Sequence, residues 1–247
     1  RWEGRVALVT GASSGIGQAV AEKLASCGLK VAGCARRMDR LESLATKITK
    51  SGGQFMPIQT DLQNPDEILQ MFEHLRQQWN GVDVLVNNAG LGHKAPLLTG
   101  ETDQWKEMLD VNVLALLICS REAVKDMQKN GDNGHVIHIS PMSGHRVPPG
   151  GGVYSATKFS VRALTEALRH ELRHASSQIR VTAISPGFVE TEFAEKFNES
   201  QEVAKETYGR FPVLQSSDIA EAVTYALAQP PHAQIHDILI RPTQQPS

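Results

Sequence analysis

The sequence predicts an α/β fold: one doubly wound domain over residues 1–247, built on a seven-stranded parallel sheet. Two observations predict it. Short, β-rich apolar runs alternate with amphipathic segments of helical periodicity along the whole chain, as in repeated strand–helix–strand units. The runs are also apolar at nearly every position, and not only at every second one, which is typical of strands buried on both faces of a parallel sheet.

The elements follow one another in order from the N-terminus. The first strand is expected at 5–10, and the first helix starts near Ile16, repeats apolar positions at Val20 and Leu24, and stops at Gly28. Pro65 is well placed to open the third helix. Further strands are expected at 30–35, 54–59, 82–88, 135–140, 179–185 and 237–240, and further helices at 38–50, 65–79, 101–127, 153–175 and 216–229.

The stretch 190–212 breaks this alternation, because it is polar with scattered Phe193, Phe197 and Phe211. One interpretation is a surface excursion. The other is a substrate lid, since the stretch follows the sixth strand at the end of the sheet where such folds bind ligands. We predict that the stretch 190–212 is a substrate lid.

The composition argues against several kinds of partner. A formal net charge of -2 lacks the concentrated basic face that nucleic acid requires. Cys27, Cys34 and Cys119 are widely spaced and are expected as free thiols in a reducing compartment. No apolar run approaches the length of a membrane span and no signal peptide is evident. We therefore expect a cytoplasmic protein without a membrane span.

A glycine-rich turn, TGASSGIG, joins the first strand to the first helix. Glycines at these positions allow a tight turn and close approach of a ligand, and the helix start offers free N–H groups to a pyrophosphate. In this strand–turn–helix setting the motif favours a Rossmann-type dinucleotide site over a purely structural turn. The residues expected to bind the cofactor there are Gly11, Ser13, Ser14, Gly15, Ile16 and Gly17.

The end of the second strand indicates which dinucleotide binds. An NAD site usually carries an acidic residue there for the ribose 2′-hydroxyl, whereas this chain has Ala35 followed by Arg36 and Arg37. Two guanidinium groups without a carboxylate favour the 2′-phosphate of NADP. The alternative is a solvated basic helix start, and we predict NADP(H).

In the segment YSATK, Tyr154 and Lys158 are four residues apart on a helix and therefore share a face. A phenol has an ordinary pKa near about 10, and a nearby ammonium lowers that pKa toward the range needed for acid–base catalysis. Such a pair is common on helix surfaces. Its position after the fifth strand of a dinucleotide-binding pattern favours catalysis.

These motifs, together with NNAG (87–90), Asn112 in DVNVLA and SPG (185–187), make the chain resemble the short-chain dehydrogenase/reductase family over essentially its whole length. The segments CSREA, SGHRV, TEALRHELR and DILIRPT are most similar to the member-11 type and to insect farnesol dehydrogenases. Proteins of these types oxidise or reduce steroids, isoprenoid alcohols and other carbonyl compounds with NADP(H). The resemblance also implies a homodimer or homotetramer.

The resemblance implies a role for each matching residue. Tyr154 would exchange a proton with the substrate oxygen, Lys158 would lower the tyrosine pKa and hold the nicotinamide ribose, and Asn112 would steady a water in a proton relay. Further cofactor contacts are implied for Asp61, Leu62, Asn88, Pro186, Val189 and Thr191. Histidines His93, His138 and His145 have no metal-like spacing, so no metal site is predicted.

One position departs from the family pattern. A serine is expected thirteen residues before the tyrosine to hydrogen-bond the substrate oxygen, and this chain has Pro141 there, which has neither hydroxyl nor N–H. Ser143 or a bound water could supply the donor if the chain stays extended. Ser140 could do so by a local shift, although alternation turns it to the opposite face. The third alternative is that nothing replaces the serine.

The leading hypothesis is an NADP-dependent oxidoreductase that interconverts a carbonyl and an alcohol on a small apolar substrate, steroid-like, isoprenoid or another ketone or aldehyde. Its activity would be reduced by Pro141, because one missing oxyanion donor costs about 10²–10³ in rate. The alternative is an NADP-binding pseudoenzyme with weak or no catalysis.

Overall fold

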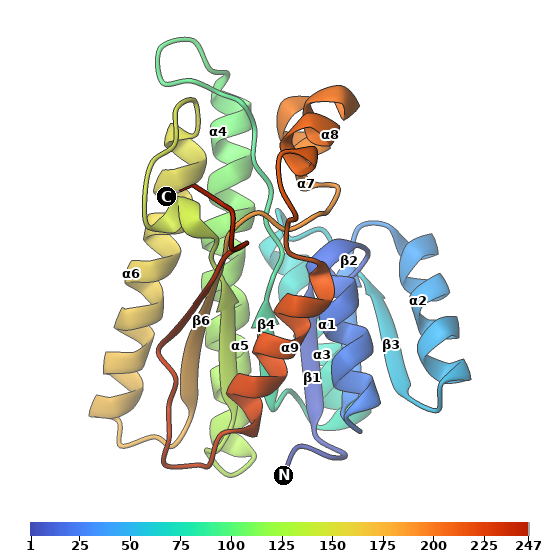
Figure 1. Ribbon diagram of the computed structural model, residues 1–247. Coiled ribbons are helices and arrows are strands. Elements are labelled where there is room, and N and C mark those ends of the chain that lie inside the picture. The colour runs from blue at the N-terminus through green and yellow to red at the C-terminus, as the bar shows by residue number, and fades with distance from the viewer. Residues whose placement is uncertain (247) are drawn as a thin grey trace.

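In a computed structural model that describes residues 1–246, the sheet consists of seven parallel strands (Figure 1). They are β1 (Val6–Thr10), β2 (Lys30–Ala35), β3 (Gln54–Gln59), β4 (Val84–Asn87), β5 (His135–Ile139), β6 (Arg180–Pro186) and β7 (Asp237–Ile240). Their order is β3-β2-β1-β4-β5-β6-β7. The order reverses between β1 and β4, and the crevice at the carboxyl ends of these two strands is where doubly wound sheets bind ligands. The predicted fold class is confirmed.

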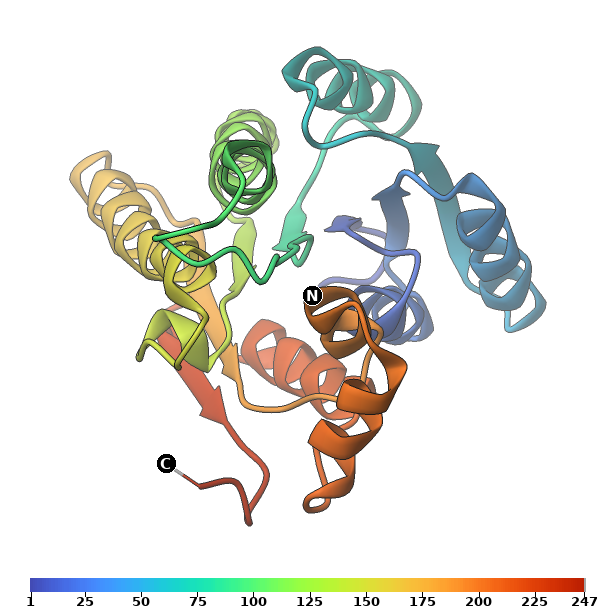
Figure 2. The same cartoon turned by 90° about the horizontal axis from the view of Figure 1, so that it is seen from above.

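Helices cover both faces of the sheet, as the view from above shows (Figure 2). One face packs against α1 (Gly15–Ser26), α2 (Met38–Lys50) and α9 (Ser216–Ala228). The other packs against α3 (Pro65–Trp79), α5 (Ala115–Lys129) and α6 (Gly152–His174). Val20 and Leu24 on α1 are fully buried, as are Phe72 and Leu75 on α3. These two layers hold the strand ends rigidly in place.

The start of α3 shows why the local sequence forms a helix. Asn64 is the N-cap, and its side chain accepts a hydrogen bond from the Asp66 N–H. Pro65 follows in the first helical turn, where its missing N–H costs nothing. Asn80 ends the helix in a left-handed conformation that asparagine tolerates well. The predicted role of Pro65 is confirmed.

The helix predicted over 101–127 is present as one uninterrupted helical run, but its geometry is not uniform. It consists of α4 (Thr102–Leu109), a π-helical turn (Asp110–Leu114) and then α5. Asn112 lies in that turn and is almost fully buried. Its amide exchanges two hydrogen bonds with the backbone of Leu91, at 2.9 and 2.8 Å. Single π turns inside helices frequently mark functional sites, and helical periodicity in sequence does not reveal them.

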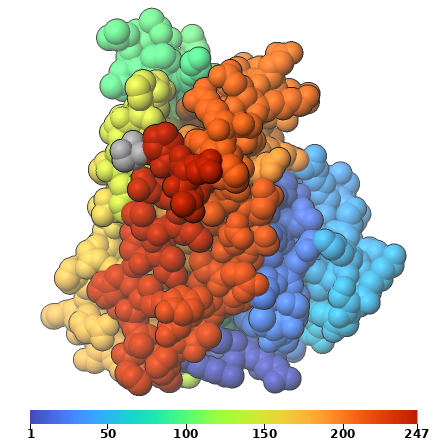
Figure 3. Space-filling view, in the orientation of Figure 1, coloured from blue at the N-terminus to red at the C-terminus, as the bar shows by residue number. Residues whose placement is uncertain are grey.

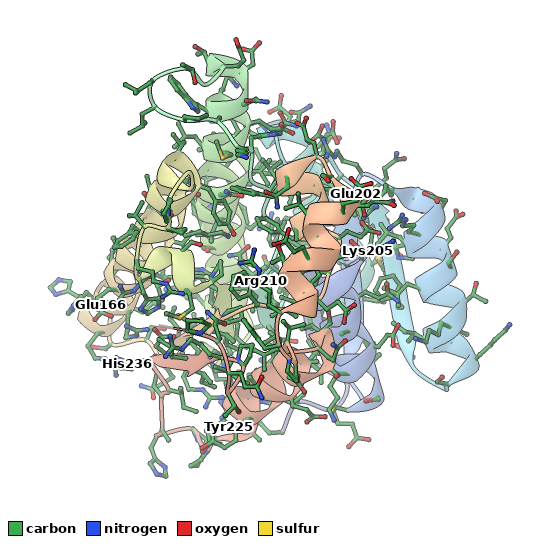
Figure 4. All side chains as sticks on the ribbon, turned by 45° about the horizontal axis from the view of Figure 1, so that its top comes forward. Glu166, Glu202, Lys205, Arg210, Tyr225 and His236 are labelled. Carbon is green, nitrogen blue, oxygen red and sulfur yellow. The ribbon has the colours of Figure 1, made fainter. Side chains whose placement is uncertain are left out.

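The stretch 190–212 contains two short helices, α7 (Phe193–Asn198) and α8 (Gln201–Gly209). Both lie at the carboxyl ends of the strands, above the sheet in Figure 1. Exposed charged side chains include Glu202 and Lys205 on α8 and Arg210 directly after it (Figure 4), whereas Ala204 is buried. A lid function for this segment stays a prediction.

The C-terminal residues (dark red in Figure 3) pack on the surface beside the α7–α8 region. The Gln245 side chain accepts a hydrogen bond from the Phe188 N–H at 3.0 Å, which ties the tail to the segment after β6. Among residues 1–246, no helix combines the length and apolar character needed to cross a bilayer. Cys27, Cys34 and Cys119 are free thiols.

Candidate active site

The glycine turn between β1 and α1 has the geometry of a phosphate cradle. Gly11 and Gly15 have φ of +69° and +54°, which favours glycine at both positions. A Cβ on Gly17 would lie 2.3 Å from the Gly11 carbonyl oxygen, so no larger residue fits there. Ile16 packs against the core and fixes the start of α1. The turn therefore leaves backbone accessible at a helix N-terminus, which suits a pyrophosphate.

Asn88 holds the two central strands together at the switch point. Its amide nitrogen donates to the Thr10 carbonyl oxygen at 2.9 Å, and its backbone N–H donates to the Thr10 hydroxyl at 3.0 Å. Thr10 and Ala89 line a small recess together with Leu62. The predicted cofactor residues Leu62 and Asn88 thus lie beside the same crevice.

Asp61 orders the loop after β3. Its carboxylate accepts from the Gln63 N–H at 3.0 Å, and its own N–H donates to the Glu67 carboxylate at 2.7 Å. This loop precedes α3 and carries the predicted adenine contacts.

The two predicted phosphate-binding arginines differ in their surroundings. Arg37 donates to the Ser13 hydroxyl at 3.1 Å and to the Ser14 hydroxyl at 2.9 Å, so its guanidinium lies directly on the glycine turn. Arg36 is exposed and lies 3.8 Å from the Glu107 carboxylate. Arg37 therefore has the better position for an anion bound beside the turn.

Tyr154, Lys158 and Asn112 converge on one buried spot. Lys158 is one helical turn from Tyr154 on α6, and its Nζ lies 5.8 Å from the centre of the tyrosine ring. A Cβ placed on Gly90 would lie 3.0 Å from Lys158 Nζ and 3.3 Å from Asn112 Oδ1. The ammonium and the amide oxygen therefore both face Gly90.

A hydrogen-bonded link connects Asn112 to the tyrosine backbone. The Asn112 amide nitrogen donates to the Thr157 hydroxyl at 3.0 Å, and Thr157 donates to the Tyr154 carbonyl oxygen at 2.7 Å. Thr157 is buried within YSATK. The sequence analysis missed its role. The signal was available, because a buried threonine three residues after a tyrosine on a helix faces the same side.

Burial controls the protonation of the tyrosine and the lysine. Desolvation raises the pKa of the Tyr154 phenol above its ordinary value and lowers the pKa of Lys158 to about 8. We expected the lysine to lower the tyrosine pKa. In this structure desolvation of the buried phenol outweighs any such lowering, and the role of Lys158 stays a prediction.

Two phenylalanines of α7 enclose the tyrosine. The Tyr154 ring centroid lies 5.3 Å from that of Phe193 and 6.0 Å from that of Phe197. Trp105 and Leu91 pack against the same cluster. The tyrosine ring is thus flanked by apolar side chains, which suits an apolar ligand.

Pro141 occupies the position where a serine was expected to donate a hydrogen bond to the substrate oxygen. Its φ of -63° and ψ of 174° are extended, but the chain then turns into a 3₁₀ helix at Met142–Gly144. The extended path that would have returned Ser143 to the tyrosine side is therefore absent. Ser140 is fully buried, and its hydroxyl donates to the Lys158 carbonyl oxygen at 3.3 Å. Ser140 is thus engaged with α6, and the donor role of Ser143 stays a prediction.

The segment after β6 brings the remaining predicted residues to the crevice. Pro186 ends the strand, and Val189 is buried and bridges to Leu214. Thr191 lies against the glycine turn, since a Cβ on Gly15 would be 3.0 Å from its methyl group. Glu192 follows, and its carboxylate binds Arg37 at 3.0 Å. The sequence analysis missed Glu192, because an acidic residue in a polar loop has no distinguishing sequence pattern.

The fold and this arrangement define an α/β dinucleotide-binding class of protein, and comparison with known proteins narrows it. The family model described as short chain dehydrogenase matches residues 5–202. Dehydrogenase/reductase SDR family member 11 of Bos taurus is 53% identical over 99% of this chain and 98% of its own. Farnesol dehydrogenase of Aedes aegypti is 42% identical over 98% of this chain and 97% of its own.

A solved structure, the closed form of serine dehydrogenase complexed with NADP+, superposes with a TM-score of 0.91. It is 32% identical, and the match covers 98% of this chain and 96% of that one. This chain therefore belongs to the short-chain dehydrogenase/reductase family of oxidoreductases, as its motifs indicated.

Proposed function

We propose that this protein is an NADP(H)-dependent oxidoreductase that interconverts a carbonyl and an alcohol on an apolar substrate. The observation that carries this proposal is the convergence of Tyr154, Lys158 and Asn112 beside the rings of Phe193 and Phe197. A proton donor, a cation and a hydrogen-bonding amide meet there at the edge of a dinucleotide crevice, next to apolar surface.

The residues of the crevice fit the cofactor. The glycine turn suits the pyrophosphate, and Arg37 beside Ser13 and Ser14 suits a 2′-phosphate. When bound, the dinucleotide supplies or accepts the hydride. Pro186, Val189 and Thr191 would hold its nicotinamide end, and Asp61 and Leu62 the adenine.

The protein's own residues manage the proton. In the reductive direction Tyr154 would give its proton to the substrate oxygen. The reverse, oxidative direction would require the phenolate form of Tyr154 to take the proton from the alcohol. The raised pKa of Tyr154 keeps the phenol protonated at neutral pH, which is the form that reduction needs. Lys158 would hold the nicotinamide ribose, and Asn112 would position a water behind the lysine.

Pro141 favours a second candidate, an NADP-binding protein with weak or no catalysis. No hydroxyl is available at that position, and Ser140 is engaged with the backbone of α6. Ser143 or a bound water would have to stabilise the substrate oxygen for efficient turnover.

The experiment that separates the candidates is NADPH consumption with a panel of ketosteroids, diketones and long-chain aldehydes, with Tyr154→Phe as the blank and NADH as the comparison cofactor. Turnover that disappears in Tyr154→Phe while NADPH fluorescence still reports binding supports the enzyme. Binding without turnover by the wild type supports the pseudoenzyme. No enhancement of NADPH fluorescence would contradict both.

We further propose a homodimer or homotetramer in the cytoplasm. Leu109, Leu114 and Leu117 on the α4–α5 stretch and Phe159 on α6 are all at least 39% exposed, and such apolar surface suits a subunit contact. Sedimentation velocity of the purified chain would test the assembly. The three free cysteines suit a reducing compartment.

A further inference from the structure

A single short segment, residues 191–197, touches three parts of the proposed site. Thr191 lies on Gly15 of the glycine turn. Glu192 binds Arg37 beside that turn. Phe193 and Phe197 cover the tyrosine ring. The glycine turn, Arg37 and the ring of the proposed catalytic tyrosine are therefore all contacted by the same piece of chain.

Glu192 anchors this segment through its carboxylate. One oxygen lies 3.0 Å from the Arg37 guanidinium and 3.0 Å from Lys196 Nζ, and the other binds the Arg40 guanidinium. The hydrogen bond from Arg40, with those from Lys196 and Arg37, lowers the pKa of Glu192 to about 2. The carboxylate is thus ionised throughout the physiological range and ties α7 to the start of α2.

The Arg37 guanidinium, which binds Glu192, is also the group proposed to bind the 2′-phosphate of NADP(H). Arg37 also donates to Ser13 and Ser14, so its position beside the glycine turn is fixed. A carboxylate and a phosphate can each offer two oxygens to the planar donor fork of an arginine. Two anions at one guanidinium repel each other, and only one of them can keep the site.

We propose that Glu192 stands in for the 2′-phosphate of NADP(H), and that this phosphate, by displacing Glu192 from Arg37 and Arg40, releases α7 from Tyr154. The inference rests on the proposed function and deepens it. Glu192 is the N-cap of α7 and Phe193 is its first residue, so loss of the ion pairs of Glu192 removes the tether at the start of the helix that carries the ring over the tyrosine. NAD(H) lacks the phosphate and leaves the anchor in place. NADP(H) and NAD(H) therefore differ in how far they expose Tyr154, as well as in how tightly they bind.

The test uses adenosine 2′,5′-bisphosphate, which carries the 2′-phosphate but no nicotinamide, and adenosine 5′-monophosphate as the matched ligand. Amide hydrogen exchange of α7 would be measured by mass spectrometry with each ligand, and affinities by calorimetry at fixed ionic strength. The variant is Glu192→Gln. The control is Glu195→Gln, which removes the same charge from the same helix but binds Gln201 and neither arginine.

The bisphosphate should raise exchange in α7 of the wild type several-fold, and the monophosphate should not. Glu192→Gln should show the raised exchange without ligand and bind the bisphosphate about two- to tenfold more tightly, because a competing ion pair of modest strength is gone. Its affinity for the monophosphate should match that of the wild type. Glu195→Gln should behave as the wild type in both measurements.

Unchanged or weaker bisphosphate binding by Glu192→Gln, or α7 exchange that ignores the 2′-phosphate, would overturn the inference and leave Glu192 a static tether. Equal affinity for the two ligands in the wild type would also overturn it. None of these readouts depends on turnover. A chain that fails to reduce any carbonyl can therefore still pass this test, and an active enzyme can still fail it.

Discussion

The ring of Phe193 packs against the ring of Tyr154 with their centroids 5.3 Å apart and their planes inclined by 43°. The tyrosine is 8% exposed as a result of this and neighbouring contacts. One aromatic contact from α7 therefore helps to determine both the access to the proposed proton donor and its pKa.

Phe193→Ala should lower the pKa of Tyr154 toward the ordinary phenol value, because water then reaches the hydroxyl and desolvation weakens. A raised folded-state pKa means that the phenol stabilises the fold fully below about pH 10 and that this contribution is lost as the pH rises further. The chain has three tyrosines, so carbon-13 labelling at the phenol carbon would resolve each titration by NMR.

The control for that measurement is Phe211→Ala, which removes a ring that packs on Phe188 with 6.1 Å between centroids. Its Tyr154 titration should match that of the wild type. An unchanged titration in Phe193→Ala would mean that the backbone around α6, and not α7, dehydrates the hydroxyl.

Asn112→Ala should lower the free energy of unfolding by about 1–3 kcal/mol, because the Leu91 N–H loses its acceptor inside the protein. Urea unfolding would measure the change. Gln128→Ala removes an exposed amide from the last turn of the same helical stretch and should cost less. Equal losses in the two variants would argue that the π turn is held by its backbone alone.

His138 makes stability depend on pH. Its ring nitrogens lie 2.8 Å from the Thr165 hydroxyl and 3.2 Å from the Ser120 hydroxyl, and burial lowers its pKa to about 3. The unfolded chain takes up the proton near pH 6.5, so the stabilisation is present above that pH and is lost as the pH falls toward the folded-state pKa. Each such proton contributes a slope of about 1.4 kcal/mol per pH unit.

The wild type should therefore lose stability between about pH 6.5 and pH 5, the interval above the main titration of carboxylates. Burial also lowers the pKa of His135 and of His145, so up to three protons contribute. His138→Gln should remove about a third to a half of the slope in urea unfolding curves, and His232→Gln, at an exposed position, should leave it unchanged. An undiminished slope in His138→Gln would assign the effect to other groups.

Much of the architecture was predictable because it depends on local patterns. The apolar runs and helical repeats indicated all seven strands and both helix layers, and Pro65 marked a helix start. The glycine turn and the pair Tyr154 and Lys158 could be identified because each combines a motif spacing with a position directly after an expected strand.

The features that the sequence did not reveal depend on contacts between distant segments of the chain. Glu192 meets Arg37 across 155 positions of sequence, and no local pattern encodes that pairing. The π turn at Asn112 arises from hydrogen bonds to Leu91, 21 residues earlier. The direction of the Tyr154 pKa shift follows from burial of the phenol, which depends on how distant segments pack around it and which the neighbouring lysine in the sequence does not reveal.

Pro141 is the position where one substitution can separate catalysis from stability. Its φ of -63° is open to serine, whose hydroxyl would start from the same Cβ that the proline ring now occupies. Replacing proline also frees the unfolded chain, which costs about 0.4–1 kcal/mol of stability. A gain in rate together with a loss in stability cannot come from better folding.

Pro141→Ser should raise kcat about 10²–10³-fold, the value of one donor to a developing oxyanion, while Tm falls slightly. Pro141→Ala is the matched control, because it gives the same backbone freedom without a hydroxyl, and it should show the lower Tm and no gain in kcat. If the serine variant gains nothing and Ser143→Ala removes the wild-type rate, Ser143 already supplies the donor. Equal kcat in the serine and alanine variants, with Ser143→Ala also unchanged, would mean that this corner of the site contributes no donor to the reaction.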